Sequence, residues 1–281
     1  SRVIFKHLKK FTLDPRVTQD VLGKPHAEFN QEAMMDTGRV LVGVVKGEIK
    51  PTSYDNIGHK KLMGAEDLIE DFINRKKSVV KRRVKNKVDR ETDVKNVIRP
   101  NMLDREFLGF FKNGGETQLS SEGNQTNPLA MIDGHMKTTV KGMGGISTGP
   151  GMQLGSAQGV HSSHVNFLDP IDTGEKMEAG LILQLSMNSS KRGTDITSRV
   201  YDVKAKKFTF IDAITADRSN LAYPDEYRYN KKTNTYTPLK SKVKVVDKDG
   251  KFTQVLPSKV DYIIPTAQGQ FGVGVNMIPF L

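Results

Sequence analysis

Apolar residues recur at helical spacing between residues 65 and 89. This spacing predicts an amphipathic helix whose apolar stripe consists of Ile69, Ile73, Val80, Val84 and Val88. Because β-branched valine lowers intrinsic helix propensity, packing of this stripe must stabilise the helix. The remaining faces are basic and either meet solvent or lie near a phosphate backbone or an acidic partner. They carry Arg75, Lys76, Lys77, Lys81, Arg82, Arg83, Lys85 and Lys87.

Two further segments have helical patterns. Residues 32–45 predict a helix that ends in a polar turn at residues 46–48. Residues 100–111 predict a short helix that ends in a group of phenylalanines. The first part of the chain is therefore expected to be mainly helical.

Short strand-like runs dominate after residue 195. Polar turns separate them, and the sequence Asp-Lys-Asp-Gly at residues 247–250 is a hairpin signal. Residues 230–234 form another polar turn. This pattern predicts an antiparallel sheet. The expected strands are residues 199–203, 207–211, 242–246, 252–256 and 261–264.

Residues 118–190 differ from both flanks, because aromatic residues are rare there and Gly, Ser, Thr, Asn, Gln and Met dominate. The glycine-rich stretch at residues 142–151 allows tight bends or a close approach to a partner, or it is a loop with no ligand. It lacks the Lys-Ser/Thr that completes a Walker A loop. The whole chain therefore predicts a mixed α+β fold of two or three modules.

Charge narrows the class of partner. Lys and Arg number 43 against 32 for Asp and Glu, which gives a net charge of +11. Such an excess favours a polyanion, since basic side chains gain affinity by releasing counterions from phosphates. Charge that only maintains solubility is the alternative. The absence of cysteine excludes disulfides and Cys-ligated zinc. No apolar run reaches the roughly 18 residues of a membrane span.

Candidate chemistry is sparse. His161 and His164 have a spacing that permits a metal pair, but without cysteine or an obvious third ligand it favours a structural role. Asp172 and Glu175 are close enough in sequence to act as paired carboxylates, although nothing identifies a substrate. The clustered aspartates that hold a polymerase magnesium are absent. Motifs alone therefore support no catalytic residue.

Several blocks resemble the rifamycin region of bacterial RNA polymerase β subunits. The first reads QLSSEGNQTNPL at residues 118–129, and the glycine-rich stretch at 142–151 follows it. The next blocks are GVHSSH at 159–164 and DPIDTGE at 169–175, and GLI at 180–182 ends the match. Their order and spacing follow the β fork region. DNIGHKK at residues 55–61 and GVNMIPFL at residues 274–281 extend the resemblance outward.

This resemblance implies three modules in a non-catalytic part of a polymerase. Residues 1–115 correspond to a helical lobe or protrusion, 116–190 to the fork that faces the RNA–DNA hybrid, and 191–281 to the first half of the external β domain. The chain would line the channel for the hybrid and downstream DNA. It would bind no cofactor itself, because the catalytic Mg²⁺ belongs to the partner largest subunit.

The same resemblance implies partners and a location. The expected partners are the rest of β, β′-like chains, a promoter-specificity factor, the DNA template and nascent RNA, with no membrane. The enzyme would be a DNA-directed RNA polymerase, a nucleotidyltransferase, in the cytoplasm of a host cell or packaged in a virion. The absence of an initiating Met and the apolar end of the chain suggest a fragment or a split subunit.

Residues of the fork that would contact nucleic acid follow from the resemblance and from physical chemistry. A hybrid that moves by one base pair per cycle needs exchangeable, sequence-independent contacts. Amides and hydroxyls provide such hydrogen bonds, and lysines attract phosphates. The expected nucleic-acid-binding residues are Gln118, Ser121, Asn124, Asn127, Lys137, Lys141, Thr148, Asp172, Glu175 and Glu178.

Departures from the family concentrate at positions that resemble the rifamycin-binding set. The residues that differ in size or charge from the usual ones are Ser121, Glu122, Asn124, Gly134, Lys137, Thr139 and Thr148. We therefore expect a rifamycin-insensitive and divergent polymerase, encoded by a bacteriophage. A free-standing nucleic-acid-binding regulatory protein built on a β-subunit fragment is an alternative. An unrelated basic phage structural protein is a third.

Overall fold

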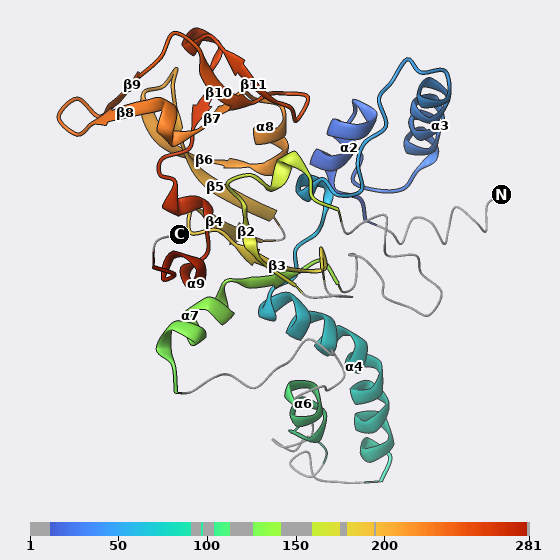
Figure 1. The fold of residues 1–281 in the computed structure, drawn as a ribbon. Helices are drawn as coiled ribbons and strands as arrows, with labels where there is room; N and C mark the ends of the chain where they lie inside the picture. Colours follow the sequence, from blue (N-terminus) through green and yellow to red (C-terminus); the bar gives the residue numbers. More distant parts are fainter. Residues whose placement is uncertain are drawn as a thin grey trace.

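The computed structural model combines helices with three antiparallel-rich sheets, which confirms the α+β class (Figure 1). It describes residues 12–90, 97, 104–112, 126–141, 159–174, 179–193 and 195–279. The described helices are α2 (Pro15–Leu22), α3 (Gln31–Val45), α4 (Ala65–Val88), α6 (Asp104–Phe111), α7 (Pro128–His135), α8 (Ala213–Asp217) and α9 (Val273–Asn276).

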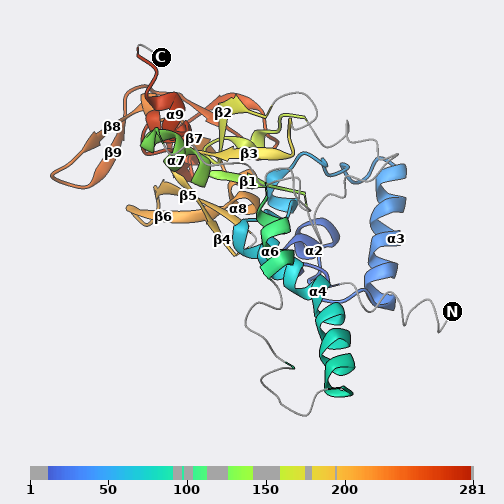
Figure 2. The ribbon, with the colours of Figure 1, turned by 90° about the horizontal axis from the view of Figure 1, so that it is seen from below.

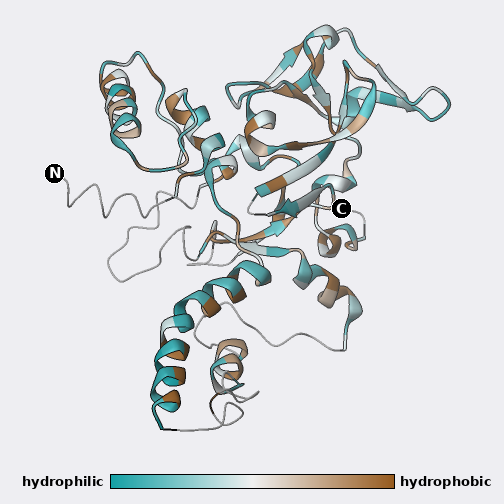
Figure 3. Ribbon diagram, turned by 180° about the vertical axis from the view of Figure 1, so that it is seen from behind, coloured by the Kyte–Doolittle hydropathy of each residue, from teal (hydrophilic) through white to brown (hydrophobic). Residues whose placement is uncertain are grey.

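The helices α3 and α4 confirm the predictions for residues 32–45 and 65–89, and α6 confirms the described part of the third. The predicted apolar stripe of α4 is wrong in its centre. Phe72 is the buried residue of this helix, whereas Ile73 is exposed. Figure 3 shows the apolar positions of α4 on the side that faces α6. The aromatic rings of α6, rather than an aliphatic stripe, therefore decide which face of α4 is covered.

The contact between α4 and α6 is aromatic. The Phe72 ring lies 5.1 Å from the Phe107 ring and 4.6 Å from the Phe110 ring, measured between centroids. Arg83 also forms an ion pair of 2.5 Å with Glu106. Because such aromatic pairs add to the free energy of area burial, this cluster holds α6 against the long helix.

The largest sheet has seven strands in the order β11-β10-β7-β12-β5-β4, with β6 paired to β5. Its pairs are antiparallel except for β7 with β12. This sheet confirms all five predicted strands near residues 199–264. Its strands are β4 (Ser189–Arg192), β5 (Asp195–Asp202), β6 (Lys207–Asp212), β7 (Leu221–Ala222), β10 (Val243–Val246), β11 (Phe252–Val255) and β12 (Tyr262–Ile263).

Two smaller sheets complete the fold. One joins β1 (Lys137–Thr139), β3 (Ile182–Leu185) and β2 (Leu168–Thr173) in that order. The other is a hairpin of β8 (Tyr227–Asn230) and β9 (Thr235–Pro238). The hairpin projects on the side of the molecule opposite to α2 and α3 (Figures 1 and 2). Both polar turns predicted from the sequence connect paired strands, one in this hairpin and one between β10 and β11.

One hydrophobic core extends across distant parts of the chain. Leu181 and Leu183 pack in it with Ile196 and Val200, and Leu62 joins them from the segment before α4. The expected module boundary near residue 190 lies within β4, and the one near residue 115 lies outside the described residues. The three-module division stays a prediction.

Replacing Phe72 by alanine should lower the free energy of unfolding by about 3–5 kcal/mol, because it removes the ring at the centre of the α4–α6 contact. Phe111→Ala is the matched control, since that ring is 56% exposed and its loss should cost far less. Chemical denaturation of both variants measures the difference. Equal losses would contradict the assignment of Phe72 as the packing centre.

Candidate nucleic-acid interface

The sheet of β1, β3 and β2 brings two of the predicted residues together. Lys137 lies on β1, the edge strand opposite Gln184 of β3, and Asp172 lies on β2. Burial raises the pKa of the Asp172 carboxyl, the carboxylate of Asp133 adds to this rise, and the Lys137 ammonium opposes it. Asp172 therefore lies within electrostatic range of Asp133 and, across β3, of Lys137, and these three residues are here called the Lys137–Asp172 cluster.

The cluster rests on a buried carboxylate, Asp169, which is only 3% exposed. Its Oδ1 accepts hydrogen bonds from the backbone N–H of Ile171 at 2.8 Å and of Asp172 at 3.3 Å. Its Oδ2 accepts from the backbone N–H of Gly272 at 2.5 Å. A Cβ at Gly272 would lie 2.8 Å from that oxygen, so only glycine permits this approach.

A second carboxylate, that of Asp133, holds the same segment two residues further along the chain. Asp133 Oδ1 accepts from Gln184 Nε2 at 2.9 Å and from the backbone N–H of Gly274 at 3.3 Å. The segment that begins α9 is thus held by two aspartates more than 100 residues earlier in the chain. Sequence reasoning gave no role to Asp133, Asp169 or Gln184. The only available signal was a glutamine in the middle of an apolar strand.

The other predicted residues that the structure describes, Asn127 and Lys141, lie apart from this cluster. Asn127 caps α7, with its Oδ1 accepting from the backbone N–H of Leu129 at 3.0 Å. Lys141 follows β1 and is half-buried, and its backbone N–H donates to Thr139 Oγ1 at 3.1 Å. Neither belongs to the Lys137–Asp172 cluster. Gln118, Ser121, Asn124, Thr148, Glu175 and Glu178 lie outside the described residues.

The two histidines of the possible metal pair have structural hydrogen bonds. His164 Nε2 lies 2.8 Å from the carbonyl oxygen of Asp55, and His161 Nδ1 lies 2.9 Å from Ser163 Oγ. Burial lowers the pKa of His164, and the nearby Lys60 and His161 contribute to the same direction. This geometry fits the structural role. Within the described residues, no group of three His, Asp or Glu side chains is placed to hold a metal ion.

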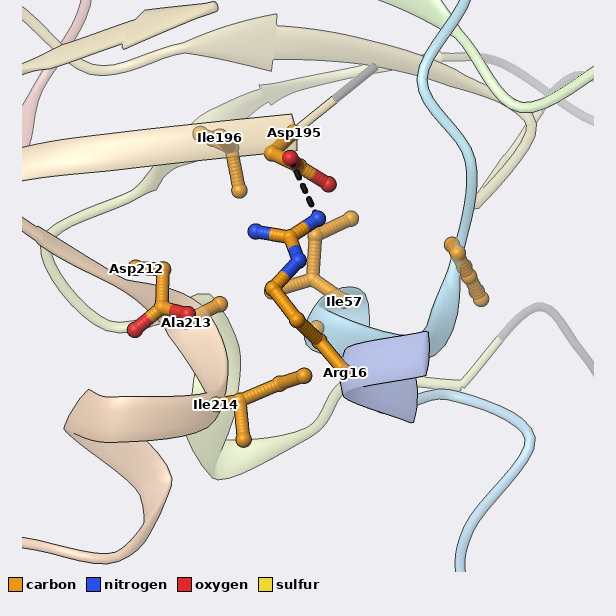
Figure 4. Close-up of a pocket in the computed structure, with 9 residues that line it drawn as sticks. Arg16, Ile57, Asp195, Ile196, Asp212, Ala213 and Ile214 are labelled. Atoms are coloured by element: carbon orange, nitrogen blue, oxygen red, sulfur yellow. Dashed lines mark ion pairs between the residues drawn. The ribbon is translucent and has the colours of Figure 1, made fainter. Parts of the chain in front are cut away.

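A pocket lies where α2 meets the large sheet (Figure 4). Arg16 of α2 pairs with Asp195 of β5 across it, beside the apolar side chains of Ile57 and Ile214. Gly58 lines the same pocket, and a Cβ there would lie 2.7 Å from the Ile214 side chain. The pocket is therefore a packed junction that anchors the N-terminal helices.

Three known proteins that are similar in sequence to this chain are DNA-directed RNA polymerase β subunits. No family model matches the chain. It is similar to DNA-directed RNA polymerase β subunits, with 26% identity over 259 residues to that of Nocardioides sp. (strain ATCC BAA-499 / JS614), covering 87% of this chain. The β subunit of Oltmannsiellopsis viridis is 25% identical over 86% of this chain, and that of Pinus thunbergii is 29% identical over 53%.

The chain spans 21%, 17% and 14% of the length of these three relatives, respectively. No helix in the described part of the chain has the length and apolar character needed to cross a membrane. The similarity supports the resemblance to β subunits that the sequence blocks indicated. The nucleic-acid contacts of individual residues stay predictions.

Asp169→Ala should lower the free energy of unfolding by about 1–3 kcal/mol or more, because three backbone N–H groups lose their acceptor. Asp172→Asn is the control, since that carboxyl is half-buried and accepts none of these bonds. Denaturation curves of both variants test the assignment. A loss for Asp172→Asn as large as that for Asp169→Ala would refute it.

The free energy of unfolding should fall as the pH decreases through the usual titration range of histidine. The pKa of His164 is lowered in the folded protein, so below about pH 6.5 the unfolded chain binds a proton that the folded chain does not. The neutral His164 ring therefore contributes fully to the free energy of unfolding above that pH range, and this contribution is lost below it. His164→Gln should flatten the dependence of unfolding free energy on pH between about 7.5 and 5.5. An unchanged slope would contradict the buried neutral ring.

Proposed function

We propose that this chain is a non-catalytic part of the β-type subunit of a multisubunit DNA-directed RNA polymerase. The observation that carries the proposal is its similarity to two polymerase β subunits over 86% and 87% of the chain. The excess of 43 basic over 32 acidic residues agrees with a nucleic-acid partner.

In this proposal the sheet of β1, β3 and β2 lines the channel for the RNA–DNA hybrid, and the glycine-rich stretch lies near downstream DNA. Lys137 is exposed on an edge strand, so its ammonium can approach a phosphate. Asp172 lies within electrostatic range of that ammonium and moderates its charge. A lysine whose charge is partly compensated attracts the phosphates of the nucleic acid without fixing it at one position, as translocation requires.

The reaction itself would take place elsewhere in the enzyme. The proposed catalytic group is Mg²⁺ in the partner largest subunit, and this chain supplies walls for the channel. The remaining proposed partners are the rest of β, β′-like chains, a promoter-specificity factor, DNA and nascent RNA. Bacteriophage origin rests on sequence divergence alone and stays a prediction, as does a location in the host cytoplasm or the virion.

Charge reversal at Lys137 tests the channel assignment in the assembled polymerase. Lys137→Glu should shorten the lifetime of stalled transcription complexes and reduce the slope of their salt dependence by about one phosphate contact. Lys244→Glu is the matched control, since Lys244 is exposed on β10 of the large sheet. If both variants, or neither, change the lifetime, Lys137 does not face the hybrid.

The departures near the fork predict insensitivity to rifamycins. Ser121 and Gly134 provide less contact area than the residues usual in the family, and Glu122 adds a charge where an aromatic ring is usual. RNA synthesis by the purified polymerase should therefore continue at low micromolar rifampicin, with a sensitive bacterial polymerase as the control. Inhibition in that range would overturn this prediction while leaving the subunit assignment intact.

A further inference from the structure

The outer face of strands β4, β5 and β6 combines arginines with aromatic rings. Arg199 of β5 pairs with Phe210 of β6, and Tyr201 pairs with Phe208. Directly paired residues project from the same face of a sheet. The alternate residues, such as Val200 and Ile211, lie in the buried core. The face that bears Arg192, Arg199, Phe208 and Phe210, here named the arginine–aromatic face, therefore points away from that core.

The arginines of this face stack over its rings. The guanidinium carbon of Arg199 lies 4.6 Å from the centroid of Phe208, and that of Arg192 lies 5.0 Å from the centroid of Phe210. In the part of the chain that the structure describes, neither arginine forms an ion pair with a carboxylate. Phe210 is 46% exposed. Two unneutralised guanidinium groups and an exposed ring thus share one surface.

The β8–β9 hairpin extends this surface. The Tyr229 ring lies 5.9 Å from Phe208 and 4.8 Å from Tyr236. Residues 227–238 contain three cations, Arg228, Lys231 and Lys232, and no carboxylate. All three cations are exposed. The rings therefore lead from the sheet to a projecting hairpin that is purely basic (Figure 1).

We propose that the arginine–aromatic face binds single-stranded nucleic acid, with unpaired bases stacking on Phe210 and on the planes of Arg192 and Arg199. The phosphates would pair with these guanidinium groups and with Arg228. Aromatic side chains in a positively charged groove bind single strands without sequence preference, because every base has a π-face. This inference goes beyond the channel sheet and does not depend on the fork residues.

The charge of the face favours nucleic acid over another protein subunit. Its positions on β4, β5 and β6 carry Arg, Phe, Tyr, Thr, Ser and Asp, although Tyr201 is buried in a second hydrophobic cluster against which Phe208 also packs. Arginine and aromatic residues are common at protein interfaces as well, whereas an excess of positive charge suits a polyanion. The two aspartates are already engaged, because Asp195 pairs with Arg16 and Asp212 caps α8 through the backbone N–H of Thr215. The charge left for a partner is positive.

The test uses the full chain and a fluorescent oligouridine of about twelve nucleotides, with affinity measured by anisotropy. Phe210→Ala and Arg199→Ala should each weaken binding about tenfold, and Phe210→Tyr should restore it. Phe252→Ala is the matched control, since Phe252 is 71% exposed on β11 and should have no effect. A duplex of the same length should respond to Arg199→Ala but little to Phe210→Ala.

Ultraviolet cross-linking gives an independent readout, and the peptide joined to the oligouridine should contain residues 207–212. The proposal is overturned if Phe210→Ala and Arg199→Ala bind the oligouridine as the unaltered chain does. It is also overturned if they only reduce the association of another polypeptide. Because these experiments use no polymerase activity, failure here is distinguishable from failure of the proposed function.

Discussion

One hydrophobic core joins the small sheet to the large sheet and fixes their relative position. Leu183 and Leu185 of β3 pack with Ile196 and Val200 of β5, so the small sheet and the large sheet cannot move independently. Ile57 and Leu62 join the same core from the segment before α4. The position of the basic helix and the position of Lys137 are both fixed through these contacts.

Buried aspartates fix the relative orientation of the packed segments. A hydrophobic core is tolerant of small shifts, whereas the bonds from Asp169 to three backbone N–H groups specify one arrangement. They place the start of α9 against β2. The proposed channel needs walls that stay in place while the hybrid moves, and this combination of core and buried polar bonds is suited to that task.

Local patterns predicted the elements with strong periodicity. Helices α3 and α4 and strands β5, β6, β10, β11 and β12 follow from spacing and turn residues that lie within a few positions of one another. The signals for α7 were also local, since Asn127 and Pro128 are typical of a helix start, but they were not interpreted as such. The centre of α4 was misplaced because a single buried phenylalanine, Phe72, outweighs several valines in packing area.

The candidate site could be predicted only in part. Lys137 and Asp172 were predicted from the resemblance to β subunits. They lie on strands of three and six residues that both pair with β3, and such short strands have little local signal in the sequence. Asp169, Gln184 and Gly272 were missed because their contacts join residues that are 51 to 103 positions apart in the sequence. The Arg199–Phe208 and Arg192–Phe210 contacts likewise depend on strand register, which a single sequence does not specify.

Purification of the tagged chain from its native source, followed by mass spectrometry of the co-purifying proteins, tests whether it is a polymerase subunit. We expect a stable complex that contains a largest-subunit chain with the polymerase aspartate cluster and that synthesises RNA on a DNA template. A chain that purifies alone and binds nucleic acid without such partners would contradict it, and would favour a free-standing nucleic-acid-binding regulator.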